Sequence, residues 1–382
     1  MFAIFAGLME NSALTDTDIL GLISGFKIDV NIASVHPFGS GHINDTYRII
    51  NSDADGADYL LQRVNHHVFQ DVPALMQNLQ HVTDHLKKKL ALKPNADTEK
   101  EVLTIIPTKD GRPYLQDEEG NYWRMFLFLK DTRSYDQVET PKQAYEGGKA
   151  FGRFQALLAD LDTGLITDTI PDFHHIESRL AKLKQAVEAN SEGRAQRVIM
   201  EIIFIKQRVP EMSELLALGK AGIIPQRIVH NDTKFNNVLL NNKDKAQCVI
   251  DLDTVMPGYV AYDFGDSIRT IINTAAEDEA EVKKIDLNIP LFEAYTQGYL
   301  KEANGFLTKA EVDSLMKGVL LLPYMQAVRF LTDYLEGDHY FKIHSPDHNL
   351  QRTRAQLALV KKLEDNEATL QKIISKTRKQ YK

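Results

Sequence analysis

The sequence predicts an α+β protein with two lobes, a small β-sheet lobe with one main helix and a larger, mainly helical lobe. Two observations predict this division: β-type runs fill the first third of the chain, and long amphipathic helical patterns fill the rest. A third is a short β-rich island that interrupts the helices and carries polar residues. With 382 residues and 43% hydrophobic content, the chain can bury a substantial core without disulfides. We place the lobes at 1–130 and 131–382, because the pattern changes after Asp131.

The first lobe is predicted to hold four strands and its main helix. Turn residues such as Asn51-Ser52-Asp53 and Asp110-Gly111 separate the apolar runs. Between the second and third runs, apolar residues from Val68 to Leu86 recur at helical spacing, which predicts a helix over 71–90. The strands are expected at 46–50, 59–64, 102–106 and 122–129.

The second lobe is predicted to hold long helices around a β-hairpin. An extended segment at 226–230 leads to two strands, 238–240 and 248–251, on either side of the turn Asn241-Asn242-Lys243-Asp244. The amphipathic helices are expected at 141–161, 174–190, 195–218, 289–303, 309–335 and 347–377.

Composition narrows the classes of partner. The 45 Lys and Arg against 53 Asp and Glu give a net charge of −8, so neither a nucleic acid nor an anionic membrane is an expected partner. The single cysteine, Cys248, excludes a disulfide framework and fits a reducing cytoplasm. No run approaches the ~20 apolar residues of a membrane span, and the apolar stretch 1–9 lacks the basic region of a secretory signal. We expect a cytoplasmic monomer or weak homo-oligomer whose partners are small molecules.

The strongest chemical signal lies in the hairpin. His230 and Asp232 are followed by Asn237, five residues after the Asp, and by Asp251, nineteen residues after it. Phosphoryl transfer needs an acceptor for the proton of the attacking hydroxyl and oxygen ligands for the metal that bridges the phosphates. We expect Asp232 to act as the base, Asn237 and Asp251 to bind Mg²⁺, and His230 to hold the loop. Lys234 is placed to offset charge on the γ-phosphate of ATP. A polar turn with incidental acids is the alternative, which the kinase-like spacing disfavours.

A second acidic tripeptide invites a different assignment of the metal ligand. Asp263-Phe264-Gly265 spells the metal-binding tripeptide of protein kinases, but it lies 31 residues past Asp232. The strand-terminal Asp251 has the expected spacing. We therefore predict that Asp263 is the N-terminal cap of the helix that runs through Ile268 and Ile271.

A segment with two glycines is the candidate phosphate loop. Gly39-Ser40-Gly41 precedes the strand expected at 46–50, and glycine lets the backbone approach phosphates and adopt positive φ. Asn44 stands where the usual third glycine would be, so a plain hairpin turn is the alternative. Coupled with the catalytic hairpin, the phosphate loop is the favoured interpretation. The adenine of ATP is then expected against a hinge at Phe128–Asp131, with Phe128 and Leu129 as its binding residues.

The third strand departs from the protein-kinase pattern. Protein kinases place a lysine here and pair it with a glutamate of the next helix. This chain has Gln62 and Arg63 instead, and the helix expected at 71–90 has no glutamate. Either residue is a candidate for contacting the α- and β-phosphates, with Asn78 as a neutral partner on the helix. The missing ion pair argues against a protein kinase.

Together these residues resemble the aminoglycoside phosphotransferase-like superfamily, which has a protein-kinase-like fold, and within it the bacterial N-acetylhexosamine 1-kinases. The likeness runs from residue ~36 to residue ~360. The catalytic hairpin is common to the superfamily, whereas the C-terminal string from Arg329 to Asp338 is much more specific to the sugar kinases. The other matching stretches are 41–44, 61–62, 230–237, 250–257, 263–269, 340–341 and 348–350.

The resemblance implies transfer of the γ-phosphate of ATP, with Mg²⁺, to the anomeric (C1) hydroxyl of GlcNAc or GalNAc. It implies that Asp232 is the base and Asp251 the principal metal ligand. Arg329, Tyr340 and His42 would contact the sugar. From spacing alone, however, surface residues are the favoured interpretation of Arg329 and Tyr340.

Two alternatives stay open. One is another small-molecule kinase of the superfamily, acting on an aminoglycoside, choline or homoserine, and the other is a nucleotide-binding scaffold without catalysis. The resembling family also has Gln on the third strand, so Gln62 does not indicate an inactive enzyme. A polycationic aminoglycoside needs a dense acidic surface, for which the run 277–281 is the only candidate, and Lys283-Lys284 follow it at once.

Overall fold

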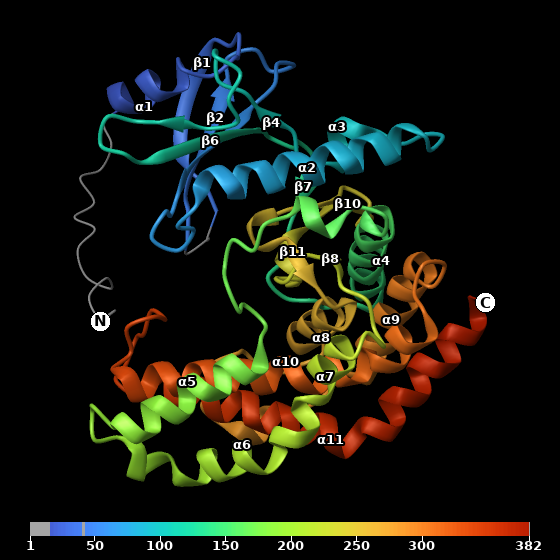
Figure 1. The fold of residues 1–382 in the computed structure, drawn as a ribbon. Coiled ribbons are helices and arrows are strands. Elements are labelled where there is room, and N and C mark those ends of the chain that lie inside the picture. Colours follow the sequence, from blue (N-terminus) through green and yellow to red (C-terminus); the bar gives the residue numbers. More distant parts are fainter. Residues whose placement is uncertain (1–15, 40–42, 382) are drawn as a thin grey trace.

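The computed structural model describes residues 16–39 and 43–381, and its N-terminal part is an antiparallel β-sheet (Figure 1). The strand order is β1-β2-β3-β6-β4, and β5 also pairs with β6. The strands span Ile32–Pro37 (β1), Asp45–Asn51 (β2), Tyr59–Val64 (β3), Ile105–Ile106 (β4), Leu115–Gln116 (β5) and Tyr122–Leu127 (β6).

The two faces of this sheet have different neighbours. Leu61 packs in one cluster with residues of α1 (Asp16–Ile23), whereas Val64 packs in another with the apolar face of α2 (Val72–Ala91). Side chains alternate between the faces along a strand. Within β3, Gln62 therefore lies on the α2 side and Arg63 on the α1 side. Only the α2 side faces the rest of the protein (Figure 1).

The helix expected at 71–90 is confirmed, and the strand expected next to it is largely wrong. Asp71 caps α2 by accepting a hydrogen bond from the backbone N–H of Ala74 at 2.9 Å. Asp97 caps a further helix, α3 (Thr98–Glu101), in the same way. The segment expected to be extended over 102–106 leaves that helix at Val102, so only the two residues of β4 remain as strand.

The C-terminal part is mainly helical, so the predicted fold class is confirmed. The expected helix at 289–303 is reproduced residue for residue by α9. The helices span Pro141–Leu158 (α4), Ile176–Ala189 (α5), Ile199–Met212 (α6), Glu214–Lys220 (α7), Val260–Ile271 (α8), Ile289–Ala303 (α9), Lys309–Glu336 (α10) and His348–Gln380 (α11). Short 3₁₀ turns span Thr163–Leu165 (η1), Ala195–Val198 (η2), Phe235–Asn237 (η3), Leu252–Thr254 (η4) and Val282–Lys284 (η5).

The single helix expected at 195–218 is wrong, because three elements share that segment: η2, α6 and α7. Pro210 lies in the last turn of α6 and removes a backbone donor there. Ser213 ends α6 and begins α7. Hydrophobic spacing continues across this break, so the sequence pattern alone did not show it.

Helices α4 and α9 lie unusually close together because glycines line their contact. A Cβ at Gly148 or Gly152 of α4, or at Gly298 of α9, would collide with the backbone of the facing helix. At Gly152 that Cβ would lie 2.5 Å from the carbonyl oxygen of Tyr299. The close approach fixes the position of α4, which reaches the catalytic loop described below.

Two small sheets hold the polar island. The predicted hairpin is confirmed as β9 (Val238–Asn241) and β10 (Ala246–Val249), with β7 (Thr132–Arg133) added beside β9. The other sheet pairs β8 (Arg227–Val229) with β11 (Met256–Gly258). The loops 230–237 and 250–255 connect the two sheets and therefore lie next to each other.

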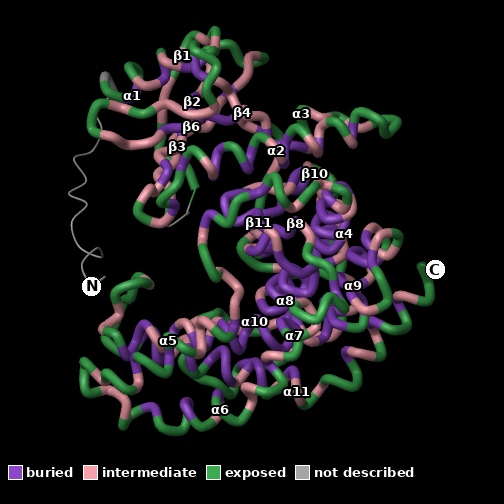
Figure 2. Tube along the Cα trace, viewed as in Figure 1, coloured by how far each residue is buried: buried purple, intermediate pink, exposed green. Residues whose placement is uncertain are grey.

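Buried residues concentrate in the helical part, and a second cluster joins the two parts (Figure 2). That second cluster contains α2 together with Cys248, Leu252 and Val255 of the hairpin region. The apolar packing is therefore continuous between the two parts. The lobe boundary placed between residues 130 and 131 stays a prediction. Within the part of the chain that the structure describes, no helix is long and apolar enough to span a bilayer.

Candidate active site

The loop between β8 and β9 brings the predicted base, cation and metal ligand together. Lys234 Nζ lies 3.0 Å from Asp232 Oδ1. The side-chain amide of Asn237 donates to the carbonyl oxygen of Asp232 at 2.8 Å and to its Oδ2 at 3.2 Å. The Asp232 side chain keeps 24% of its surface exposed, so an incoming hydroxyl has access to it.

Asp232 is held in its ionised form. Burial tends to raise the pKa of its carboxyl, but the positive charge of Lys234 and the neighbouring His230 and Arg269 outweigh burial and lower the pKa. The pKa of Lys234 is raised in turn, chiefly by the charge of Asp232. At neutral pH the pair is therefore a carboxylate beside an ammonium group.

His230 connects the two loops and has no free ring nitrogen. Its Nδ1 accepts the backbone N–H of Asp232 at 3.3 Å, and its Nε2 donates to the carbonyl oxygen of Ile250 at 2.9 Å. The rings of Phe151 and Phe154 meet the buried imidazole edge to face. Through both ring nitrogens His230 is thus arranged to hold the two loops together.

Asp251 follows β10 and presents its carboxylate at an exposed position next to the catalytic loop. Its backbone is left-handed, with φ of 59°. Enclosure by surrounding protein atoms, together with the carboxylates of Asp253 and Asp232, raises the pKa of Asp251 to about 6. A nearby cation stabilises the ionised form of a carboxyl group whose pKa is raised in this way.

The donor set fits a magnesium ion shared with a nucleotide. In the described residues, no three His, Cys, Asp or Glu side chains gather closely enough to hold a metal by themselves. Mg²⁺ typically takes one or two carboxylates and completes its shell with waters and phosphate oxygens. Asp251 supplies one carboxylate, and Asn237, whose amide nitrogen is engaged with Asp232, has its carbonyl oxygen to offer.

The prediction that Asp263 caps its own helix is wrong. Helix α8 begins at Val260, so Asp263 already lies in its first turn. Its fully buried carboxylate accepts the backbone N–H of His230 at 2.8 Å, the N–H of Asn231 at 2.7 Å and the amide of Gln155 at 2.7 Å. Asp263 therefore holds the backbone of the catalytic loop in place.

A second acidic residue of α8, Asp266, also holds the catalytic loop, and the sequence analysis did not predict this role. Asp266 accepts the backbone N–H of Thr233 at 2.9 Å and pairs with Arg269. Asp263 and Asp266 are three residues apart and so lie on one face of the helix. That spacing, in a helix that directly follows the hairpin, was the available signal.

Only part of the candidate phosphate loop can be located. Gly39 has φ of 83°, a conformation that favours glycine, and it lies on the surface. Ser40, Gly41 and His42 lie outside the described residues. The predicted nucleotide contacts of this loop, and the predicted sugar contact of His42, therefore stay predictions.

Gln62 and Arg63 point in different directions. Gln62 donates to Thr46 Oγ1 at 3.0 Å and accepts from Arg124 Nε at 3.0 Å, on the face that meets α2. Arg63 pairs with Asp45 on the opposite face. Of the two candidates, Gln62 is the one directed toward the catalytic loops.

The predicted hinge follows β6 directly. The backbone N–H of Phe128 donates to the carbonyl oxygen of Asp58 at 2.9 Å, which ties the hinge to the start of β3. The Phe128 ring meets Phe38 edge to face, and the Arg48 guanidinium lies 4.1 Å from the ring centre. Leu129 is buried.

Arg329 and Tyr340 lie together, on the helical side of the catalytic loop. The Arg329 guanidinium carbon lies 5.6, 5.7 and 5.4 Å from the ring centres of Phe173, Tyr340 and Phe341. His174, which follows Phe173, connects this group to the catalytic loop. Its Nε2 lies 3.0 Å from the carbonyl oxygen of Asn231, next to Asp232. Arg329 and Tyr340 are thus parts of one polar and aromatic cluster.

Arg179 joins this cluster and was not predicted. Burial, and then the like charge of Arg329, lower the pKa of Arg179 to about 10. Its guanidinium donates to the carbonyl oxygen of Phe173 at 2.8 Å, while its buried Nε has no hydrogen-bond partner. In the described part of the chain, neither Arg179 nor Arg329 forms an ion pair within 4.0 Å, and the charge of Asp172 acts on Arg179 only from a longer distance. The two neighbouring cations thus have no directly paired carboxylate.

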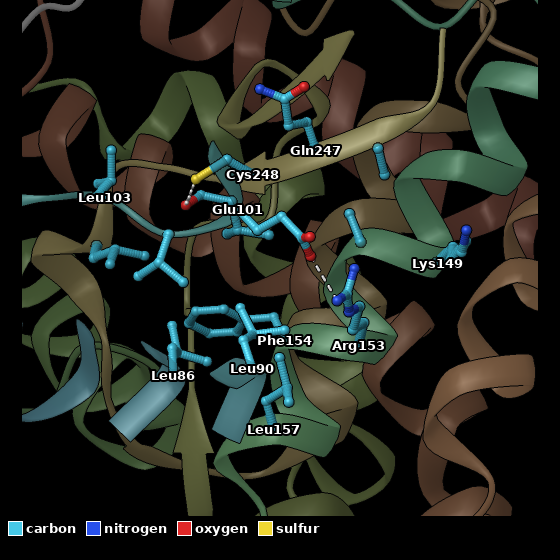
Figure 3. Close-up of a pocket in the computed structure, with 15 residues that line it drawn as sticks. Leu86, Leu90, Glu101, Leu103, Lys149, Arg153, Phe154, Leu157, Gln247 and Cys248 are labelled. Atoms are coloured by element: carbon cyan, nitrogen blue, oxygen red, sulfur yellow. Dashed lines mark hydrogen bonds and ion pairs between the residues drawn. The ribbon is translucent and has the colours of Figure 1, made fainter. Parts of the chain in front are cut away.

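A separate cavity behind the hairpin is not the catalytic site. It has a volume of about 50 Å³ and is lined by apolar residues of α2, α4 and β10 (Figure 3). Cys248 also faces it, and Glu101 and Arg153 form an ion pair at its edge. The cavity holds none of the residues of the catalytic loop and is too small for a nucleotide.

The fold and the two catalytic loops define a kinase-like phosphotransferase. Residues 34–300 match the model of the family described as APH, phosphotransferase enzyme family. Because the match covers more than half of the chain, the chain belongs to the phosphotransferase enzyme family.

Solved structures share the whole fold at low sequence identity. An aminoglycoside phosphotransferase from Alicyclobacillus acidocaldarius is 13% identical, with a TM-score of 0.62 over 94% of this chain and 96% of that chain. A choline kinase from Cryptosporidium parvum is 14% identical, with a TM-score of 0.57 over 92% and 97%. An amicoumacin kinase in complex with AMP-PNP, Ca²⁺ and Ami is 13% identical, with a TM-score of 0.56 over 92% and 94%. At these identities the likeness concerns the fold, and it confirms the kinase-like architecture.

Proposed function

We propose that the protein is an ATP- and Mg²⁺-dependent kinase that phosphorylates the anomeric (C1) hydroxyl of an N-acetylhexosamine, GlcNAc or GalNAc, and releases ADP. The observation that carries the choice of substrate is the pair Arg179 and Arg329, which lies beside the catalytic loop without a carboxylate partner. Such a pair suits hydroxyl and carbonyl oxygens of an acceptor and repels a cation.

The charge around this site argues against the cationic acceptors of other small-molecule kinases. An aminoglycoside or choline would need acidic or unopposed aromatic side chains. The acidic run 277–281 is largely engaged within the protein: Glu277 pairs with Arg269, Glu281 pairs with Lys284, and Asp278 lies 3.0 Å from His348. The run is therefore not available for a polycation.

The proposed mechanism rests on positioning and on preorganised charge. Asp232 would accept a hydrogen bond from the C1 hydroxyl and receive its proton as the bond to phosphorus forms. Lys234 would lie beside the transferred group, and Arg329 with Tyr340 would hold the sugar ring. Asp251 and Asn237 would hold Mg²⁺, which supplies neutralisation of the phosphate charge. His230, Asp263 and Asp266 would keep the loop in place.

The proposal is tested by ADP release with Mg-ATP against GlcNAc, GalNAc, glucose, galactose, choline, homoserine and kanamycin. Turnover on the two N-acetylhexosamines, with loss of reducing-end reactivity in the product, is the expected result. Turnover on another acceptor would support a small-molecule kinase with a different substrate. An Asp232→Asn variant serves as the control for contaminating kinases. If the protein binds ADP but releases none from ATP with any acceptor, the scaffold alternative becomes the better account.

A further inference from the structure

We infer that Arg124 on β6, held by Gln62, is a positioning residue that takes over the structural task of the lysine–glutamate pair of protein kinases. It couples the β-sheet to the loop that carries the metal ligand Asp251. The inference rests on the proposed kinase function only in that it needs a nucleotide with its metal. It does not depend on which acceptor is phosphorylated.

Arg124 stands next to the position where protein kinases have their strand lysine. Gln62 and Arg124 are directly paired partners in the β3–β6 ladder, so their side chains leave the same face of the sheet. Arg124 Nε donates to Gln62 Oε1 at 3.0 Å. The cation that β3 lacks is thus supplied by the neighbouring strand, and the glutamine orients it.

The anion for this cation comes from the hairpin region and not from the helix. Arg124 makes a two-contact ion pair with Asp253, with distances of 2.5 Å from Nη1 to Oδ1 and 2.9 Å from Nη2 to Oδ2. Both side chains are almost completely buried. The pair joins residues 129 positions apart, across the junction of the sheet with the catalytic loops.

Helix α2 contributes no polar partner to this group. Asn78, the expected neutral partner of the strand residue, instead exchanges two hydrogen bonds with the backbone of Thr167, at 2.8 and 2.9 Å. That expectation is wrong, because both polar groups of the Asn78 amide are engaged with Thr167, in the segment after α4. From α2, the Met76 sulfur lies 3.9 Å from Arg124 Nη1. The usual role of the helix glutamate has therefore moved to Asp253.

Asp253 is placed to transmit this contact to the metal site. It lies two residues after Asp251, in the 3₁₀ turn η4 that begins at Asp251. Asn44, at the end of the candidate phosphate loop, also donates to Asp253 Oδ2, at 2.8 Å. The buried carboxylate of Asp253 thus connects the metal-ligand loop to the phosphate-loop segment and to β6.

The arrangement predicts a specific effect on nucleotide binding. Without Arg124, the loop of Asp251 loses its attachment to the sheet, so Mg²⁺ should no longer strengthen nucleotide binding. Groups that orient a metal ligand typically change metal affinity by ~10- to 100-fold. Binding of the adenosine portion should be unaffected, because it depends on the hinge.

The experiment is calorimetric titration of ADP into Arg124→Met, Asp253→Asn and the wild-type chain, each in Mg²⁺ and in EDTA, with adenosine as a further ligand. We expect the ratio of Kd in EDTA to Kd in Mg²⁺ to fall at least ~10-fold in each single variant. The double variant Arg124→Gln/Asp253→Asn leaves no unpaired buried charge and should lose no more than either single variant. Arg124→Lys keeps one contact, so its ratio should lie between those of the wild type and Arg124→Met.

Matched controls separate this role from a loss of stability. Arg208→Met removes a two-contact pair with Glu364 far from the site and should keep the wild-type ratio. An unchanged ratio in Arg124→Met would overturn the inference. Equal losses of ADP affinity with and without Mg²⁺ would also overturn it, because Arg124 would then act directly on the phosphates. So would a loss confined to Asp253→Asn, which would make Asp253 itself a metal ligand.

The two proposals fail in different ways. Wild-type protein that binds Mg-ADP but phosphorylates no N-acetylhexosamine would refute the proposed substrate and leave the role of Arg124 intact. Conversely, sugar phosphorylation by a protein in which Arg124→Met keeps the Mg²⁺ effect would refute only the role of Arg124.

Discussion

Replacing Asp263 by asparagine should weaken catalysis through the backbone of the catalytic loop, although Asp263 touches no substrate in the proposed mechanism. Its Oδ2 accepts the His230 N–H and the Gln155 amide, and its Oδ1 accepts the Asn231 N–H. Asparagine keeps the shape but has only one acceptor oxygen. The best arrangement keeps that oxygen at Oδ2 and turns the new NH₂ group toward the Asn231 N–H.

The magnitude follows from that single conflict. One hydrogen bond to a charged acceptor is lost, worth ~1.5–3 kcal/mol, and one buried N–H loses its partner. Burial raises the pKa of Asp263, so the carboxylate itself is costly to bury and asparagine recovers part of the loss. We expect the free energy of unfolding to fall by ~2–3 kcal/mol. Because Asn231 directly precedes Asp232, a displacement of ~1 Å should lower kcat by ~10²-fold.

The assay combines urea unfolding with steady-state kinetics of the acceptor that the substrate panel identifies. Asp263→Asn should lower kcat far more than it changes the KM for ATP. The control is Glu201→Gln, which removes a buried carboxylate of α6 paired with Arg354 and should lower stability with kcat within about three-fold of wild type. If Asp263→Asn loses the expected stability but keeps kcat within three-fold, Asp263 does not position the base and the reasoning fails.

The remaining predictions concern single side chains. Asp232→Asn should lower kcat at least ~10²-fold while the Kd of Mg-ADP, measured by calorimetry, stays nearly constant; unchanged turnover would remove Asp232 from the role of base. Arg329→Ala should raise the acceptor KM ~10-fold, and a change confined to the KM for ATP would place Arg329 outside the acceptor site. Burial lowers the pKa of His174 to about 4, so the unfolded chain binds the proton more readily and stability should fall, by at most ~3 kcal/mol, as pH drops from 6.5 toward 4. In urea unfolding, the free energy of unfolding should fall less between pH 7 and pH 4.5 in His174→Gln than in the wild type. Gly152→Ala should lower the free energy of unfolding by ~1–3 kcal/mol, because its Cβ would lie 2.5 Å from the Tyr299 carbonyl oxygen.

Local patterns predicted most of the elements that carry the site. β3 and α9 appear at the expected residues, and the hairpin around Asn241 appears with its turn. These elements have strong local signals, namely apolar alternation, helical periodicity and a cluster of turn-forming residues. The spacing of Asp232 and Asn237 was also readable, because both lie in one short loop.

The residues that the sequence did not reveal are those whose partners are far away in the chain. Asp263 was assigned to its own helix because capping is a local rule, yet its partners lie 32, 33 and 108 residues upstream. Asp253 pairs with Arg124 across 129 residues, and Arg179 lies 150 residues before Arg329. Spacing in one sequence carries no record of such contacts, so tertiary packing alone decides them.

The electrostatics of Asp232 bear on which hydroxyl it serves. A general base is most effective when its pKa lies near the working pH, and Lys234 holds the pKa of Asp232 well below that. Such a weak base contributes most where the acceptor needs little activation and the proton leaves late, as in a loose phosphoryl transfer. The C1 hydroxyl of a sugar is a hemiacetal and more acidic than an ordinary alcohol. A weak base fixed by His230 and Asp263 is therefore compatible with the proposed C1 hydroxyl as the acceptor.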